Sequence, residues 1–208
     1  MTLVVLSLSR VHSSYVNCID ILSVNRALYA MQSVPERFET ERLVLRKYQE
    51  GDERSVFEYA SNEEAVKYMN WPRHLSIDDS FDFTRYAIKA FEKNLEFAFG
   101  VILKDENKFI GSTGFQLLDS ETALLGFILH PDYWHKGYAT EAAGCIYNWL
   151  CRHSGLKYIT ALCHAANSAS IGVLEKIGIP YECTENEISL FPNLEVENHE
   201  TMYYRKVI

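Results

Sequence analysis

The stretch HPDYWHKGYATEAAGCIYNWLCRH, His130 to His153, decides the fold because it separates two apolar segments that have the composition of β-strands. From Gly137 to His153 its apolar residues recur at steps of three and four, the period of an amphipathic helix. A strand, a helix and a second strand form a crossover, which makes the two strands parallel neighbours. Ligands of open sheets bind just beyond the carboxyl ends of such strands. The segments at these ends are 133–141, after the strand 122–129, and 165–170, after the strand 158–163.

The residues before this crossover predict an antiparallel meander preceded by helices. Two polar turns, 105–107 and 119–121, are so short that the three strands they join must form hairpins. Capping residues and apolar periodicity predict the helices, and alternation of apolar and polar residues predicts an opening strand. The expected elements are a strand at 42–47, a helix from Asp52, a short turn from Asn62 to Met69, a helix from Ile77 to Lys93, and strands at 97–104, 108–118 and 122–129.

The residues after the crossover predict one more helix and a closing hairpin. Asn167 suits the start of a helix as an N-cap, and Gly178 suits its end. Two further strands are expected near 179–190 and 199–207. The whole pattern predicts a mixed α+β fold with about four helices around a central, mostly antiparallel sheet. That sheet is expected to hold about seven strands and one parallel pair.

Composition indicates a folded chain with one main domain. Of its 208 residues, 48% are hydrophobic and 23% are charged, which excludes a disordered chain, a collagen and a coiled coil. The formal net charge of -8 argues against a nucleic-acid partner, because neutralising phosphates supplies most of that affinity. Residues 35–208 contain no linker or repeat and are expected to form a single domain. Residues 1–34 carry few charges and no clear period. They are expected to be either an extension packed on the domain or a segment upstream of a later start at Met31.

Cysteine usage and hydropathy indicate a cytoplasmic protein. The five cysteines show neither a CxxC pair nor a zinc-ligand spacing, so we expect no disulfide framework and no metal site. No apolar run approaches the roughly 18 residues that cross a membrane. The short apolar stretch at 3–6 also lacks the preceding basic residue of a secretory signal. We therefore expect no membrane partner, and the protein to be a monomer or a homodimer.

The two segments beyond the parallel strands have a chemical and a purely structural interpretation. At the start of the crossover helix, free N–H groups and the helix dipole attract phosphate, Gly137 admits a close approach and Lys136 adds a cation. The alternative is an ordinary loop in which Gly137 relaxes the turn and Tyr133 and Trp134 pack. For the second segment, a capped structural helix beginning at Asn167 explains its residues equally well.

Together, HPDYWHKGYATEA (130–142) and ANSASIGVLEKIGI (166–179) resemble the acetyl-CoA-dependent GNAT N-acetyltransferase superfamily. Two upstream segments, ETERLVLRKYQEGD (39–52) and AVKYMNWPRHLSIDD (65–79), are similar to the branch that contains the ribosomal-protein alanine and serine N-acetyltransferases. The match continues in the same order from about Glu39 to the end. This resemblance implies a GNAT-like fold whose parallel strands separate into a V-shaped cleft. It also implies acetyl-CoA as co-substrate and no metal.

The resemblance further implies roles for residues at matching positions. Leu129 would pair with the pantetheine arm of the cofactor, and its N–H would polarise the thioester carbonyl. Asn167 would hydrogen-bond the same arm, and Ser170 would protonate the departing thiolate. Tyr68 and Trp71 are expected to line the acceptor side, with surface packing of their loop as the alternative. The backbone N–H groups expected to hold the pyrophosphate belong to His135, Lys136, Gly137, Tyr138, Ala139 and Thr140.

Three positions depart from the pattern of the family. His135 stands where glycine is frequent, and Leu174 stands where many members carry a tyrosine acid. Leu124 occupies a strand position that often holds a glutamate, which removes one candidate base. The sequence does not choose among the carboxylates that can replace this base, which are Glu185, Glu187 and Glu197.

The missing glutamate bears on the acceptor because only a neutral amine attacks a thioester. An α-amino group with a pKa of about 7.8 is about one-tenth neutral at pH 7, whereas a lysine with a pKa of about 10.4 is about 0.04% neutral. The expected function is therefore direct transfer of acetyl from acetyl-CoA to an N-terminal α-amine of a protein or peptide, in a ternary complex. The alternatives are a small-molecule amine acetyltransferase and a non-catalytic acyl-CoA-binding module.

Overall fold

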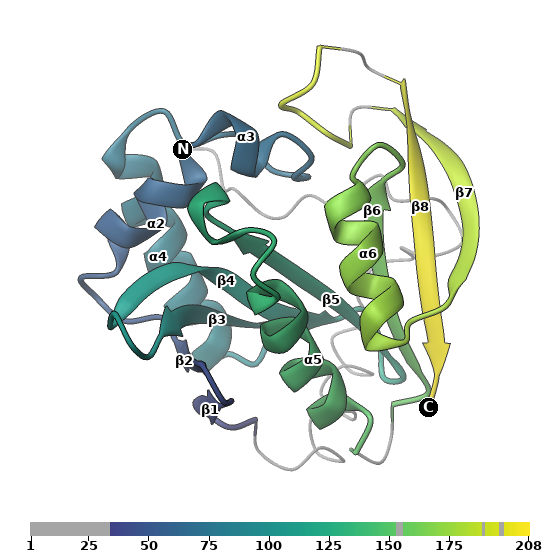
Figure 1. Ribbon diagram of the computed structural model, residues 1–208, viewed down its shortest axis with the longest axis horizontal. Coiled ribbons are helices and arrows are strands. Elements are labelled where there is room, and N and C mark those ends of the chain that lie inside the picture. The colour runs from purple at the N-terminus through teal and green to yellow at the C-terminus, as the bar shows by residue number, and fades with distance from the viewer. Residues whose placement is uncertain (1–33, 153–155, 189, 196–197) are drawn as a thin grey trace.

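A sheet of eight strands, in the order β1-β2-β3-β4-β5-β6-β8-β7, runs through the part of the chain that the structure describes (Figure 1). The structure is a computed structural model, and it describes residues 34–152, 156–188, 190–195 and 198–208. Its strands are β1 (Arg37–Glu39), β2 (Leu43–Lys47), β3 (Glu96–Leu103), β4 (Lys108–Leu117), β5 (Thr122–Leu129), β6 (Tyr158–His164), β7 (Tyr181–Ile188) and β8 (Asn198–Val207). Its α-helices are α2 (Glu53–Ala60), α3 (Glu63–Val66), α4 (Ile77–Glu92), α5 (Tyr138–Leu150) and α6 (Ser168–Ile177).

The predicted fold class is confirmed: the fold is mixed α+β, and its sheet is mostly antiparallel with one parallel pair. One strand that the sequence did not predict, β1, pairs with β2 through only three residues. Such a short strand shows no readable alternation of apolar and polar residues. The turn expected after Asn62 is a short helix, α3, and the Asn62 side chain accepts hydrogen bonds from two of its N–H groups. Residues 1–33 of the expected extension lie outside the described residues.

The parallel strands β5 and β6 separate soon after they meet. They pair only from Thr122 to Leu124, whereas β5 continues along β4 as far as Leu129. The Thr122 carbonyl accepts from the Leu118 N–H, and the His130 N–H donates to the Ile110 carbonyl, so the backbone groups of these even-numbered residues face the β4 side. The alternation of the strand therefore turns the backbone groups of the odd-numbered residues toward β6. Beyond Leu124 this edge of β5 is therefore open. The V-shaped cleft predicted from the family resemblance lies here.

The two faces of the sheet have different cores. On one face, the helices α5 and α6 bury Ile146 and Leu174 against the strands, and both helices lie side by side in Figure 1. On the other face, α2 and α4 bury Val56 and Ala87 against strand residues that include Ala98. The first face is called the helix α5 face below, and the second the helix α4 face.

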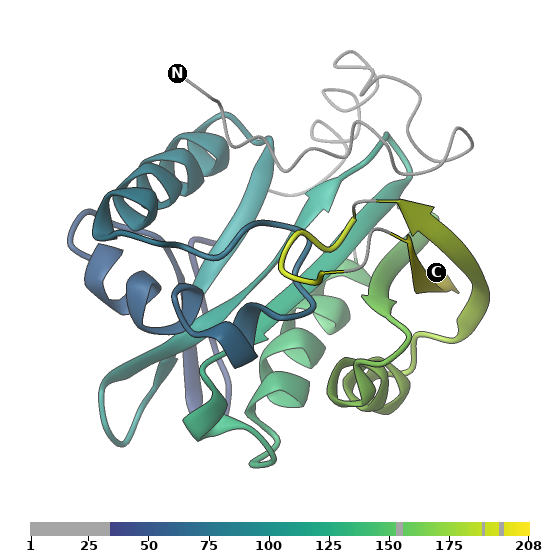
Figure 2. The ribbon, with the colours of Figure 1, turned by 90° about the horizontal axis from the view of Figure 1, so that it is seen from above.

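A loop before β8 closes over the helix α4 face. The side chain of Asn193 donates to the carbonyl oxygens of Val66 and Trp71 and accepts from the N–H of Arg73, each at 2.8 Å. Figure 2 shows this loop, in yellow, against the blue segment that connects α3 to α4. The C-terminal hairpin thus holds in place a segment more than a hundred residues earlier in the chain.

Candidate active site

The start of helix α5 is built around backbone in the left-handed conformation. Gly137, the N-cap, has φ 80° and ψ 0°, and His135 has φ 58°. A left-handed backbone favours glycine, which explains physically why position 135 often holds glycine in the family; histidine tolerates this conformation better than most residues. The His135 side chain is exposed.

Free N–H groups mark this helix start. Glu141 is the first residue of α5 whose N–H reaches a carbonyl of the turn, that of Gly137, at 3.0 Å. The N–H groups of Tyr138, Ala139 and Thr140 therefore have no acceptor within the helix. Three such groups at the positive end of a 13-residue helix form a site with the chemistry of phosphate recognition.

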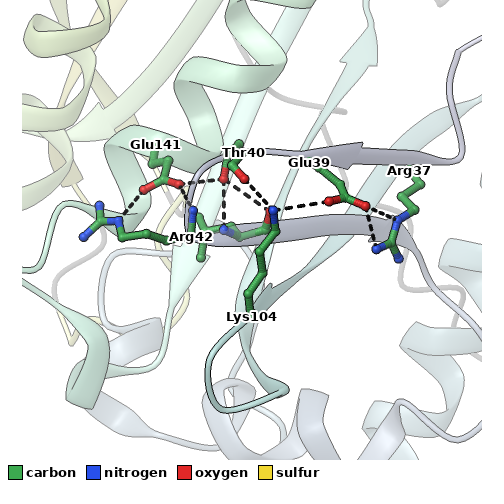
Figure 3. A network of polar contacts seen from close by, with 7 residues as sticks. Arg37, Glu39, Thr40, Arg42, Lys104 and Glu141 are labelled. Carbon is green, nitrogen blue, oxygen red and sulfur yellow. Dashed lines mark hydrogen bonds and ion pairs between the residues drawn. The ribbon is translucent and has the colours of Figure 1, made fainter.

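An ion-pair network fixes this helix start to the edge of the sheet (Figure 3). The Glu141 carboxylate accepts from the Thr40 hydroxyl at 2.6 Å, from the Arg42 N–H at 2.8 Å and from the Arg42 Nε at 2.7 Å. Burial alone raises the pKa of Glu141, but these hydrogen bonds outweigh burial and lower it. The carboxylate is therefore held in its charged form.

Arg42 connects this network to the helix start itself. The Arg42 Nη1 donates to the Lys136 carbonyl oxygen at 2.9 Å, and the guanidinium lies 4.5 Å from the centre of the Tyr138 ring. A β-carbon at Gly137 would lie 3.4 Å from this guanidinium. The Arg42 guanidinium thus lies beside the start of α5, whereas the Lys136 ammonium donates to the Asp132 carbonyl oxygen at 2.8 Å on the preceding turn. Free N–H groups with a neighbouring guanidinium suit a polyphosphate.

A cavity of about 230 Å³ passes through the sheet where β5 and β6 separate. Ser170 and Leu174 line it on the helix α5 face, and Trp71 and Phe83 line it on the helix α4 face. Leu125 and Cys163, from the two separating strands, line it between them. The cavity therefore has lining residues on both faces of the sheet.

The predicted residues of helix α6 lie at this cavity. The Asn167 side-chain oxygen accepts from the Ser170 N–H at 3.1 Å, so it caps the helix, and its amide NH₂ can donate to another partner. Ser170 is half-buried and lines the cavity. Leu174, one turn further along the helix, is 1% exposed and also lines it.

The structure brings the predicted acceptor residues to the same cavity. Tyr68 and Trp71 line it from the loop that Asn193 holds, and the Tyr68 ring stacks on His164 with 4.9 Å between ring centres. The remaining predicted residues lie at the carboxyl end of β5 and the start of α5. Among them, Leu129 accepts from the Trp134 indole at 2.8 Å, while strand alternation turns its N–H toward the open edge.

Three adjacent small residues form the floor of the cavity on the helix α4 face. Ala98 of β3 pairs with Gly114 of β4, which pairs with Gly126 of β5. A β-carbon on Gly126 would meet nothing within 4 Å, so this glycine borders open space. The hollow follows from the register of the sheet, because the alignment of three neighbouring strands places these small residues in one row.

A carboxylate that sequence reasoning missed lies next to this row. Glu96 begins β3, pairs with Gln116, and lines the cavity. Burial raises its pKa, while a hydrogen bond from the Tyr86 hydroxyl at 3.0 Å opposes the rise. An acidic residue at the first position of a strand has the pattern of an ordinary solvent-facing residue, so nothing in the sequence singles it out.

The three glutamates considered from the sequence have different outcomes. Glu185 lies on the edge strand β7 and is not among the described residues that line the cavity. Glu197 and the side chain of Glu187 lie outside what the structure describes. Leu124 lines the cavity on the same strand row as Glu96 and Gln116. Leu124 stands where a glutamate is frequent in the family, and a half-buried carboxylate, Glu96, lies two strands away in the same row.

Within the described ranges, no group of three or more histidine, cysteine, aspartate or glutamate side chains is placed to hold a metal ion. None of the helices in those ranges is both long enough and apolar enough to span a membrane.

Comparison with known proteins identifies the family. The family described as "Acetyltransferase (GNAT) domain" matches residues 42–179. The chain belongs to the GNAT acetyltransferase family. An uncharacterized N-acetyltransferase of Bacillus subtilis, YnaD, is 33% identical over 144 residues, which cover 69% of this chain and 82% of YnaD.

Two solved structures place this GNAT acetyltransferase among its structural relatives. A GNAT acetyltransferase from Bacillus anthracis superposes with a TM-score of 0.72 at 29% identity, covering 82% of this chain and 98% of that one. RimL, a ribosomal L7/L12 α-N-protein acetyltransferase solved with coenzyme A, gives 0.70 at 15% identity and covers 85% and 98%. At that identity RimL shows the shared fold alone.

Proposed function

We propose that this GNAT acetyltransferase transfers acetyl from acetyl-CoA to a primary amine, most favourably an N-terminal α-amine of a protein or peptide, directly within a ternary complex. The observation that carries the proposal is the cavity through the sheet, which joins Ser170 on one face to Trp71 on the other. A thioester entering from the helix α5 face and an amine entering from the helix α4 face would meet in it. The structure of RimL with coenzyme A supports the same cofactor for the shared fold.

The cofactor half of the proposal uses the helix start and the open strand edge. The backbone N–H groups of residues 135–140 would hold the pyrophosphate, with Gly137 allowing close approach. Along β5, Leu129 would pair with the pantetheine arm and the Asn167 amide would donate to it. The Leu129 N–H, aimed at the open edge, would stabilise the negative charge that develops on the thioester oxygen.

The chemical step requires a neutral amine and a protonated leaving group. The amine nitrogen forms a bond to the thioester carbonyl carbon, the carbon–sulfur bond breaks, and the proton lost from nitrogen leaves the site. The Ser170 hydroxyl would give its proton to the departing thiolate and recover one from solvent. An α-amine fits this scheme because losing its proton at pH 7 costs about 1 kcal/mol, against about 4.6 kcal/mol for a lysine.

A small-molecule amine is the second candidate acceptor. The cavity volume of about 230 Å³ lies below the roughly 300–1,000 Å³ of drug-sized ligand sites, and Tyr68 and Phe191 cover it. A site of this size suits the end of a peptide or a whole small amine. Its walls are largely apolar and include several aromatic rings, which suits an apolar amine body.

The test combines cofactor binding with thiol release. Acetyl-CoA at 100 times its Kd is expected to stabilise the fold by about 2.7 kcal/mol in a thermal scan, with acetate and ATP as controls. Release of coenzyme A thiol is then measured with peptides of different N-terminal residues, with the same peptides blocked at the N-terminus, and with small amines. Transfer to free but not blocked peptides supports the α-amine. Binding of acetyl-CoA without release on either panel contradicts the proposal and favours an acyl-CoA-binding module.

We further propose that residues 35–208 form the acetyltransferase domain, with 1–34 as an extension, and that the protein acts in the cytoplasm as a monomer or homodimer. The sheet supports the first point, because it begins at Arg37 and ends at Val207. The absence of a paired-cysteine pattern in the sequence supports the location. Comparing the acetyl-CoA affinity of the full chain with that of residues 35–208 tests the domain boundary. Sedimentation of the full chain tests the oligomeric state.

A further inference from the structure

We propose that His164 positions both substrates of the acetyl transfer and does so only as a neutral imidazole, so that its protonation lowers the activity. This inference rests on the proposed function, since it concerns the two sides of the same site. His164 is a positioning residue and is not among the residues that line the cavity. On one side it holds the turn that leads to Asn167, and on the other it supports the acceptor wall formed by Tyr68 and Phe191.

His164 is the last residue of β6, and it pairs with Thr201 of β8. Its neighbour Cys163 packs in the core of the helix α5 face, and successive side chains of a strand point to opposite faces. The His164 ring therefore points to the helix α4 face, where the amine is proposed to enter. Its backbone continues into the loop before α6, on the cofactor side. One residue thus contacts both halves of the site.

The loop between β6 and α6 folds around His164. The Ala166 N–H donates to the His164 Nδ1 at 3.0 Å, and the Asn167 N–H donates to the His164 carbonyl oxygen at 2.9 Å. Asn167 is the N-cap of α6, and its amide is the group proposed to reach the pantetheine arm. Because the His164 Nδ1 accepts a hydrogen bond, it carries no proton. The neutral His164 ring therefore carries its proton on Nε2.

A second histidine fixes the other ring nitrogen. The His164 Nε2 lies 3.3 Å from the Nδ1 of His199, whose side chain is buried. His164 is the donor of this pair, so the proton of a neutral His199 is on its own Nε2. That nitrogen is buried and has no partner among the described residues. Both rings are thus held in one tautomer, and neither accepts a further proton without the loss of a hydrogen bond.

The same two rings support the acceptor wall. The Tyr68 ring stacks on His164 with 4.9 Å between ring centres. The Phe191 ring packs edge-on against His164 at 5.0 Å and against His199 at 5.4 Å. Tyr68 and Phe191 line the cavity, whereas the two histidines are not among its described lining residues. The imidazole pair therefore forms the layer behind the wall and determines where the two aromatic rings lie.

A proton on His164 would disturb both contacts. It would enter at Nδ1, because Nε2 already carries a proton and the His164 ring is half-buried whereas His199 is buried. The N–H groups of His164 and Ala166 would then face each other, and the turn before Asn167 would have to move. The new cation would also lie behind the wall that an acceptor ammonium approaches, and like charges repel.

The surroundings of His164 favour the neutral ring. Burial lowers its pKa, and His199 and Lys67 lower it further, while Glu200 opposes them. The titratable groups around it come from the segment after α3, from β8 and from the next strand, β7, and are Lys67, Tyr68, His199, Glu200 and Glu185. His164 is therefore neutral at pH 7, and acidification is expected to charge it.

Nuclear magnetic resonance of the imidazole nitrogens tests this geometry without any substrate. Two-bond proton–nitrogen correlations distinguish the two tautomers and the charged form, and His164→Asn and His199→Gln assign the two signals. We expect both rings as Nε2–H tautomers at pH 7.5, with His164 titrating below the ordinary pKa of about 6.5. A His164 ring that carries its proton on Nδ1, or that is already charged at pH 7, would overturn the proposal.

The pH dependence of kcat/KM for a peptide acceptor tests the consequence. Below a pKa of about 7.8 the neutral fraction of an α-amine falls about tenfold per pH unit, so log kcat/KM has a slope of about 1. For the native protein we expect this slope to increase to about 2 below the pKa of His164. His164→Asn should keep a slope of about 1, because its side-chain oxygen accepts from the Ala166 N–H in place of Nδ1 but binds no proton.

His130→Asn is the matched control. The His130 Nδ1 accepts from the Asp132 N–H, also two residues later, but His130 is not among the described residues that line the cavity. This variant should keep the steeper slope of the native protein at low pH. Equal slopes in the native protein and His164→Asn would remove His164 from the site. A steeper slope that is lost in His130→Asn instead would assign the titration to the wrong histidine.

Failure of the proposed function gives a different result. Calorimetric titration of acetyl-CoA at pH 7.5 and pH 5.5 needs no acceptor and reports on the turn before Asn167. Between these pH values the native protein should lose about threefold more affinity than His164→Asn, the scale of one weakened hydrogen bond. That difference without thiol release from any amine would support the role of His164 at the cofactor side and contradict the acetyl transfer. Thiol release with equal slopes and equal affinity losses in the two proteins would do the reverse.

Discussion

The start of helix α5 and the floor of the cavity are built by opposite means. The helix start is held by a dense polar network, in which Glu141 accepts three hydrogen bonds and Arg42 reaches the Lys136 carbonyl. The cavity floor is a row of small residues, and at Gly126 nothing lies within 4 Å of the place of a β-carbon. Hydrogen bonds between side chains and backbone therefore determine the shape of the first region. The small size of the side chains determines the shape of the second.

This difference matches the two proposed ligands. A cofactor that is the same in every turnover is best bound by fixed donors, because a donor already in place loses no entropy on binding. An acceptor is selected by the shape and charge of a hollow, which single substitutions alter without disturbing the fold. Substitutions in the two regions should therefore change different kinetic constants.

The largest effect is expected at Ser170 of α6, which lines the cavity on the helix α5 face. Ser170→Ala should lower kcat by about 100-fold or more, the usual scale for loss of a positioned proton donor. Affinity for acetyl-CoA should change little, because the backbone N–H of residue 170 still donates to the Asn167 side-chain oxygen that caps the helix. Ser168→Ala, an exposed serine of the same turn, is the control. Equal turnover of the Ser170 variant and the native protein would remove Ser170 from the mechanism.

The next effect tests the polar network. Glu141→Gln should destabilise the fold by about 1.5–3 kcal/mol, because hydrogen bonds to a partly buried charge are lost or weakened. It should also weaken acetyl-CoA binding, while KM for the amine stays the same. Thermal denaturation and calorimetric titration measure the two quantities. A variant of native stability with raised amine KM would show that the two regions are not separate.

The acid dependence of the same residue gives a second measurement. The pKa of Glu141 is lower in the fold than in the unfolded chain, so its contribution is present above the unfolded value of 4.5 and is lost as pH falls through the folded value. The difference in Tm between native protein and Glu141→Gln should therefore shrink below pH 4.5. A difference that grows at low pH would contradict the assigned charge state.

A smaller effect is expected at the left-handed turn. Gly137→Val places a branched side chain at φ 80°, where an L-residue costs about 1–2 kcal/mol. Affinity for acetyl-CoA should fall about tenfold, with a modest loss in Tm. Gly172→Ala serves as the control, since this helical glycine has open space and an ordinary φ, and alanine there should stabilise α6 slightly. Titration of acetyl-CoA into both variants decides the point.

The smallest effect on stability is expected in the cavity floor. Gly126→Val should raise KM for the amine severalfold while leaving Tm and acetyl-CoA affinity nearly unchanged, because its side chain enters open space. Its neighbour Gly114 gives the contrast: a β-carbon there would lie 2.3 Å from the Phe97 carbonyl oxygen. Gly114→Ala should therefore destabilise the sheet. If Gly126→Val and Gly114→Ala lower Tm by the same amount, the cavity floor at Gly126 is not part of the amine site.

The sequence predicted the fold well because its signals are local and repeated. The spacing of the turns specified the meander, and the period of 137–153 specified the crossover that makes β5 and β6 parallel. The strand β1 escaped prediction because three residues carry no period. The crossover and capping patterns located the loop and Asn167, whereas the family resemblance supplied their expected cofactor roles and the expected role of Ser170.

The part of the site that could not be predicted depends on register. Whether Glu96 faces solvent or a cavity depends on its pairing with Gln116, and the row Ala98–Gly114–Gly126 exists only once three strands are aligned. Single positions in a sequence do not show such alignment. The same holds for His135, whose left-handed backbone is a property of the folded loop.

The hydrogen bonds of Asn193 have a consequence for the order in which the protein is made. This side chain, near the end of the chain, holds the segment of Val66, Trp71 and Arg73, which forms one wall of the cavity. Because a chain emerges from the ribosome N-terminus first, the meander and the loop before α5 exist before residue 193 has been synthesised. The wall at Trp71 is therefore completed last. A chain that ends before residue 193 lacks these three hydrogen bonds, and the segment of Val66, Trp71 and Arg73 loses the side chain that holds it.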